Sequence, residues 1–206
     1  MNALAENPRL SPLQLPNGEI WQSKTGQGVT SATAALYEYA LSCLPDKAIR
    51  IMEAGSGSGV LAILLKQANP KWKVSGLEIQ DSLNELAKDN AAGLNLNIDF
   101  INADLRLFTN ATGFDCIISN PPWQKLGSGI QSPIPERAVS RSEMCCTMRD
   151  LLSFCKRNLA AKGYALLLYP AHRSDELHRE MAGLQLQLVA SYAADRNSLI
   201  FHIDKG

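Results

Sequence analysis

The sequence predicts an α/β fold built on a doubly wound, mostly parallel sheet. Short apolar runs typical of buried strands alternate with segments whose apolar residues recur at helical spacing. A glycine-rich turn joins the first such run to the helix after it. With 206 residues, 46% of them hydrophobic, the chain is long enough for one domain with a buried core. We expect an N-terminal arm over residues 1–28 and the domain over residues 29–206.

The N-terminal residues 1–28 contain Pro8, Pro12 and Pro16 and show little periodicity, so an irregular arm is expected. Ile20 and Trp21 are its candidates for packing on the domain. A helix is predicted from Ala32 to Leu44 because its apolar residues share one face and Pro45 follows as a stop.

Five strands are expected over residues 48–53, 73–79, 98–102, 114–119 and 163–169, alternating with helices. The helix that ends near Ala68 should bury Leu61, Leu64, Leu65 and Ala68. Ser174 is the expected cap of a helix through Met181, and an amphipathic helix is expected over 144–159. Residues 124–142 form a long loop, and runs at 186–192 and 198–203 make a closing antiparallel pair. The predicted sheet therefore has seven strands.

Composition argues against several classes of protein. No apolar run approaches the roughly 20 residues of a membrane span, and the first eight residues lack the pattern of a signal peptide. The five cysteines lie in apolar segments without C-x-x-C spacing, so we expect buried thiols in a reducing cytoplasm and no metal site. Net charge is zero, but residues 124–173 hold 8 basic and 3 acidic residues. That excess fits either a solvated helix or a contact with a polyanion.

The glycine loop Gly55-x-Gly57-x-Gly59 indicates a close approach of backbone to a ligand. A dinucleotide site would have glycine where Val60 stands, and its pyrophosphate would be repelled by Glu53. A carboxylate at that position attracts an ammonium or sulfonium group instead. The loop therefore favours S-adenosylmethionine over NAD.

Two further acids follow the next strands. The carboxylate of Glu78 can accept both hydroxyls of a ribose, and Asp104 can receive an adenine amino group. Either acid alone could be a loop cap. Because Glu53, Glu78 and Asp104 fall at successive strand ends, which meet at one edge of the sheet, we expect them to form one site.

The segment Ser119-Asn120-Pro121-Pro122-Trp123 follows the strand over 114–119 and suits the binding of a planar NH2 group. The side-chain oxygen of Asn120 and the carbonyl of Pro121 can accept its two N–H bonds, and Trp123 can stack on its ring. Two acceptors favour a pyramidal nitrogen whose lone pair can attack. The alternative is a proline-rich turn with a core tryptophan.

Together, the run Glu53–Gly59, Glu78, Asp104 and Asn120–Trp123 resemble class I S-adenosylmethionine-dependent methyltransferases that methylate amino groups. Over about residues 25–203 the chain is similar to the bacterial family that methylates adenine N6 of valine tRNA. The segments Ala138–Glu143, Cys146–Asp150 and Tyr169–Arg173 carry that likeness. This chain departs from that family at two places. Trp123 stands where the family usually has tyrosine, and Gly28–Ser31 stand where the first segment of the family pattern often contains an aspartate.

The resemblance implies a Rossmann-like methyltransferase sheet and a catalytic Asn120-Pro121-Pro122-Trp123 loop. It implies cofactor contacts from Asn120 and from Glu53, Gly55, Gly57, Gly59, Glu78, Ile79 and Asp104. The expected acceptor is adenine N6 in tRNA, with Arg137 and Arg141 as candidate RNA contacts. Glutamine N5 in a protein and guanine N2 in rRNA are alternatives within the class, because each presents a conjugated NH2. A non-catalytic partner subunit is the alternative outside it.

Overall fold

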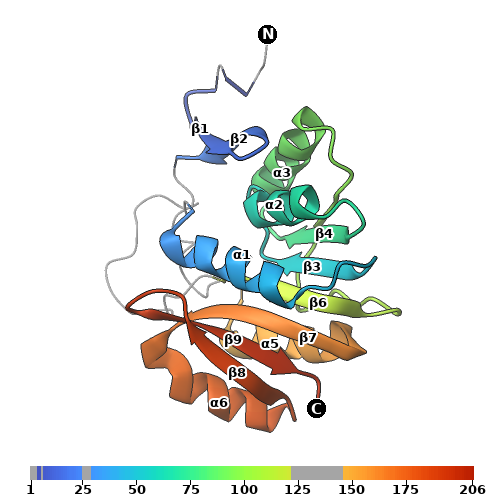
Figure 1. The fold of residues 1–206 in the computed structure, drawn as a ribbon, viewed down its shortest axis with the longest axis vertical. Helices are drawn as coiled ribbons and strands as arrows, with labels where there is room; N and C mark the ends of the chain where they lie inside the picture. The colour runs from blue at the N-terminus through green and yellow to red at the C-terminus, as the bar shows by residue number, and fades with distance from the viewer. Residues whose placement is uncertain (1–3, 6, 25–28, 122–145) are drawn as a thin grey trace.

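The central sheet of the computed structural model has seven strands in the order β5-β4-β3-β6-β7-β9-β8 (Figure 1). The structure describes residues 4–5, 7–24, 29–121 and 146–206. The strands are β3 (Arg50–Ala54), β4 (Lys73–Glu78), β5 (Asp99–Asn102), β6 (Phe114–Ser119), β7 (Leu159–Pro170), β8 (Gln187–Ala193) and β9 (Ser198–Asp204). The first five are parallel, and β9 pairs antiparallel with both β7 and β8. The predicted α/β sheet with a C-terminal antiparallel pair is confirmed.

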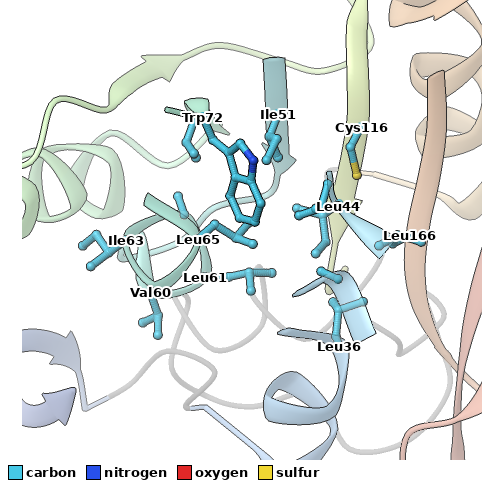
Figure 2. Packing of buried hydrophobic residues seen from close by; sticks show 14 of the residues in the cluster. Leu36, Leu44, Ile51, Val60, Leu61, Ile63, Leu65, Trp72, Cys116 and Leu166 are labelled. Carbon is cyan, nitrogen blue, oxygen red and sulfur yellow. The ribbon is translucent and has the colours of Figure 1, made fainter. Parts of the chain in front are cut away.

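Helices cover both faces of the sheet. They are α1 (Ser31–Cys43), α2 (Val60–Ala68), α3 (Asp81–Gly93), α5 (Met148–Asn158) and α6 (Ser174–Gly183). Ile51 and Cys116 pack in a cluster with α1, α2 and α3, part of which is seen in Figure 2. Their strand neighbours Met52 and Ile117 pack in a second cluster with α5 and α6. Successive side chains of a strand point to opposite faces, so each central strand supplies both layers of the core.

The N-terminal arm was expected to be irregular, and the structure corrects this expectation. The arm contains an antiparallel hairpin of β1 (Leu10–Leu15) and β2 (Gly18–Ser23). Pro12 is tolerated because β1 lies in a two-stranded sheet, where each strand leaves one edge unpaired. Ile20 is fully buried, as expected, and the amide of Asn90 on α3 bonds both the N–H and the C=O of Trp21, at 2.8 and 2.9 Å. Tertiary contacts therefore stabilise a hairpin that the local sequence does not predict.

Three smaller expectations also differ from the structure. Residues 103–113 connect β5 to β6 through turns without a helix. On α2, Leu64 is half-buried and Ala68 exposed, whereas Ala62 and Ile63 are buried in the cluster that also contains Ile20 of the hairpin. Because α2 packs against the hairpin as well as the sheet, residues on more than one face of this helix are buried. Ser174 is the first residue of α6 rather than its cap, because a 3₁₀ turn leads directly into this helix.

Replacing Gly76 with alanine should lower the free energy of unfolding by about 1–3 kcal/mol. A Cβ at Gly76 on β4 would lie 2.5 Å from Cδ1 of Phe100, a core residue on the neighbouring strand β5. For a chain of this length the change corresponds to a fall in Tm of roughly 2–12 °C, measured by thermal unfolding. Gly93→Ala is the control, because a Cβ at Gly93 would meet no heavy atom of the described residues within 4 Å and alanine favours a helix end. Equal Tm values for the two variants would contradict this packing argument.

No helix within the described residues has the length and apolar character that a membrane crossing requires.

Candidate active site

A pocket opens at the carboxyl ends of β3, β4 and β6, the edge where open α/β sheets bind ligands. The lining combines the glycine loop, the strand ends, and residues of the hairpin and of α1. Its residues include Gln22, Ser23, Val29, Thr33, Glu53, Gly55, Ser56, Gly57, Glu78, Ile79, Leu83, Asp104, Asn120, Pro121 and Cys146. Within the described ranges, no group of three or more His, Cys, Asp and Glu side chains is placed to hold a metal ion.

The glycine loop passes along the pocket in a backbone conformation that needs glycine. Gly55, Gly57 and Gly59 have φ values of 74°, 53° and 81°, in the left-handed region where other residues are strained. The N–H groups of Gly55 and Ser56 donate to the Leu77 carbonyl at 2.8 and 3.0 Å, which fastens the loop to the end of β4. The hydroxyl of Ser56 is buried and has no hydrogen-bond partner among the described residues. This oxygen lies against β4, since a Cβ at Gly76 would come within 2.8 Å of it, so the loop offers mainly its backbone to a ligand.

Glu53 is buried at the end of β3 and forms part of the pocket wall. One carboxylate oxygen accepts the N–H of Ala62 at 2.9 Å, in the first turn of α2. This bond satisfies a helix-start N–H that Gly59, which has no side chain, cannot cap. Burial nevertheless raises the pKa of Glu53 to about 8, with the Ala62 bond opposing the shift and the charge of Glu78 adding to it. The proton therefore stabilises the folded chain, and a cation in the pocket would favour its release.

The raised pKa of Glu53 predicts a pH-dependent stability. Because the folded-state pKa of about 8 lies above the ordinary value of 4.5, the contribution is fully present below pH 4.5 and is lost as pH rises through 8. Glu53→Gln removes the titration, so this variant should match wild type near pH 5 and exceed it by a few kcal/mol, roughly 2–4, near pH 8.5. Urea unfolding at both pH values measures the difference. A constant difference between the two proteins across that range would contradict the assignment.

Glu78 closes the opposite side of the glycine loop from the end of β4. One carboxylate oxygen accepts the N–H of Gly57 at 2.9 Å, and the other accepts the N–H of Gln80 at 2.9 Å. Burial raises the pKa of Glu78, and the backbone N–H bonds oppose the shift. Ile79, the next residue, exposes 39% of its surface beside the pocket.

Asp104 reaches the pocket but is not free. Its carboxylate forms an ion pair with Arg106 and accepts the Arg106 backbone N–H at 2.9 Å. The Arg106 hydrogen bond is the main cause that lowers the pKa of Asp104. The sequence predicts that this carboxylate binds an adenine amino group. In the structure its oxygens already accept hydrogen bonds from Arg106, so a ligand amine would share them.

Asn120 follows the last residue of β6 and contributes to the pocket lining. Its side-chain nitrogen donates to Oγ1 of Thr33 on α1 at 3.0 Å. Its side-chain oxygen is buried and receives no hydrogen bond from the part of the chain that the structure describes. A buried acceptor without a donor is costly, so such an atom is typical of a site that receives a ligand donor.

The structure brings together every predicted site residue that it describes except Gly59, whose role is the turn into α2. Glu53, Gly55, Gly57, Glu78, Ile79, Asp104, Asn120 and Pro121 all line one pocket. Pro122, Trp123, Arg137 and Arg141 lie outside the described residues. Sequence reasoning missed Gln22, Ser23, Thr33, Leu83 and Cys146, which also line it. Gln22, Ser23 and Thr33 carry no motif and reach the sheet edge because the hairpin and α1 fold onto the domain. Leu83 comes from α3, and Cys146 begins the segment 146–150 that carries the family likeness.

The fold is that of class I S-adenosylmethionine-dependent methyltransferases. The 16S rRNA methyltransferase RsmC of Thermus thermophilus, solved with AdoMet and guanosine, superposes with a TM-score of 0.65 at 14% identity. The match covers 96% of this chain and 50% of that one. At that identity the likeness establishes the fold.

The sequence profile of the methyltransferase small domain family matches residues 27–147, and the chain belongs to this family. A tRNA1(Val) (adenine(37)-N6)-methyltransferase of Aeromonas hydrophila is 32% identical over 131 residues, which are 62% of this chain and 54% of that protein. A release factor glutamine methyltransferase of Enterococcus faecalis is 28% identical over 113 residues, which are 52% of this chain and 41% of that protein. The chain thus spans about half the length of these curated relatives.

Proposed function

We propose that this protein is an S-adenosylmethionine-dependent methyltransferase that transfers a methyl group to adenine N6 in tRNA. The unpartnered, buried oxygen of Asn120 carries the proposal, because an exocyclic amine supplies the N–H donor that this atom lacks among the described residues. The similarity to the Aeromonas tRNA methyltransferase supports adenine N6 as the acceptor. A tRNA acceptor implies a cytoplasmic location.

The pocket suits the proposed cofactor in charge and in hydrogen bonding. Glu53 and Glu78 supply two carboxyl groups to the lining, and a bound cation favours release of the proton that burial holds on Glu53. In our assignment Glu53 and the glycine loop hold the methionine end, Glu78 and Ile79 the ribose, and Asp104 the adenine. When bound, S-adenosylmethionine supplies an electrophilic methyl carbon together with its leaving group.

The chain's own residues orient the acceptor. Asn120 Oδ1 and the Pro121 carbonyl accept the two N–H groups and draw the nitrogen toward a pyramidal geometry. In this proposal Trp123 is the stacking face for a base that leaves the RNA stack, and Arg137 and Arg141 are the candidates for phosphate or base contacts; all three lie outside the described residues. The rate gain then comes from alignment of the nitrogen with the methyl carbon.

Glutamine N5 methylation is the second candidate, since release factor glutamine methyltransferases are also similar to this chain. A glutamine amide presents the same conjugated NH2 to Asn120. Guanine N2 in rRNA would also suit this acceptor pair. A non-catalytic subunit is disfavoured because it has no use for a buried Asn120 oxygen that the described residues leave unbonded.

The test is incubation of the purified protein with methyl-labelled cofactor and three acceptor pools. The pools are tRNA, rRNA and release factors from cells in which the corresponding gene is deleted, so that target sites are unmethylated. Mass spectrometry of digested products should find labelled N6-methyladenosine from tRNA. Labelled N2-methylguanosine from rRNA, or methylglutamine from release factors, would instead identify guanine N2 or glutamine N5 as the acceptor. Tight cofactor binding without transfer to any pool would overturn catalysis.

A further inference from the structure

The contact between Asn120 and Thr33 joins segments that are 87 residues apart in the chain. Thr33 stands in the first turn of α1 and is only 7% exposed, and Asn120 follows β6. The Asn120 amide nitrogen donates to Thr33 Oγ1 at 3.0 Å, while the amide oxygen has no partner within the described ranges. Among the described residues, Thr33 is thus the group that binds the nitrogen end of this amide and leaves the oxygen end toward the pocket.

The hydroxyl of Thr33 is also part of the capping box at the start of α1, which supplies one arrangement that directs this hydrogen bond. Thr33 Oγ1 lies 3.2 Å from Thr30 Oγ1 and also accepts the Thr30 backbone N–H at 3.4 Å. If the Thr33 proton points to Thr30, both lone pairs of Thr33 Oγ1 remain as acceptors, one for Thr30 N–H and one for Asn120. In that arrangement Thr33 can receive the NH2 end of Asn120 but cannot donate to its oxygen.

An asparagine amide has two orientations of nearly equal shape, and they present opposite groups to the pocket. With its nitrogen on Thr33, Asn120 directs an acceptor at an incoming amine. With the amide reversed, the NH2 group of Asn120 would face the N–H groups of that amine, and no hydrogen bond could form between them. We propose that Thr33 is a positioning residue that holds Asn120 in its acceptor orientation, an inference that rests on the proposed methyl transfer to an amine.

Thr33→Val keeps the shape of the side chain and removes the hydroxyl. We expect kcat to fall about 10–100-fold, because the acceptor is no longer held in one orientation, with the KM for cofactor within about twofold of wild type. Thr33→Ser restores the hydroxyl and should recover most of kcat. Thr147→Val is the control for lost capping, since Thr147 forms the equivalent capping box with Asp150 at α5. It should lower Tm comparably and leave kcat nearly unchanged.

A second readout does not depend on activity. The side-chain NH2 of Asn120, assigned in ¹⁵N spectra by its loss in Asn120→Asp, should exchange with water faster in Thr33→Val than in wild type or Thr33→Ser. Unchanged exchange, or a Thr33→Val enzyme as active as Thr147→Val, would overturn the positioning role. If the wild-type protein methylates no acceptor, the proposed function fails on its own, and the exchange measurement still decides whether Thr33 holds the amide.

Discussion

Replacing Asn120 with alanine should lower the rate of methyl transfer about 10²–10³-fold while cofactor affinity stays within a few-fold of wild type. The variant removes the buried oxygen that has no partner among the described residues, which we assign to the acceptor amine. That interaction strengthens as the nitrogen becomes pyramidal, so its loss acts on the transition state more than on ground-state binding. Single-turnover transfer and calorimetric titration with the demethylated cofactor separate the two quantities.

Asn120→Asp is the companion variant. It keeps an oxygen at the acceptor position but loses the N–H that Thr33 receives and adds a negative charge. We expect an activity between those of wild type and Asn120→Ala. Normal turnover by the alanine variant would remove Asn120 from the mechanism, and a parallel loss of cofactor affinity would show that the residue belongs to the cofactor site alone.

Replacing Glu78 with alanine should weaken cofactor binding by about 100-fold or more. The carboxylate is buried at the pocket wall, so the variant removes two charge-assisted acceptors for ribose hydroxyls. It also leaves the Gly57 N–H without its 2.9 Å partner and loosens the glycine loop. Calorimetric titration measures the change in Kd.

Glu78→Gln and Glu85→Gln separate the causes of that loss. The glutamine at 78 retains one acceptor oxygen and the side-chain shape, so an intermediate affinity is expected. Glu85 on α3 is exposed and pairs with Lys88, so its replacement removes the same charge away from the pocket and should leave Kd unchanged. If Glu78→Ala bound cofactor as tightly as wild type, the assigned cofactor site would be wrong.

Much of the sheet could be predicted because its signals are local. The strand over 114–119 was placed with its observed bounds, since an apolar run enters the sheet and a rigid Pro-Pro pair ends it. Glu53, Glu78 and Asn120 could be assigned to one site because parallel strands deliver their carboxyl ends to the same edge. The boundary of the domain at residue 29 stays a prediction.

The rest depends on contacts between distant parts of the chain. The hairpin of β1 and β2 is held by the burial of Ile20 and by hydrogen bonds to Asn90 of α3. The sequence around residue 20 does not predict these contacts. The exposed face of α2 was misjudged for the same reason. The ion pair between Asp104 and Arg106, formed in the turn after β5, was not foreseen from the sequence, and the contact of Asp104 with a cofactor adenine stays a prediction.

By itself, the sequence determined the parallel sheet, the glycine turn and the polar residues at the strand ends, because periodicity and backbone conformation act over a few neighbouring residues. Only the tertiary structure decided the state of those polar groups. Folding removes Glu53 from water and raises its pKa to about 8, and the buried Asn120 oxygen keeps no partner among the described residues because α1 places Thr33 against the amide nitrogen. Solvation and hydrogen-bond partners are set by segments far apart in the chain, so the chemistry of the site appears only when the chain is folded.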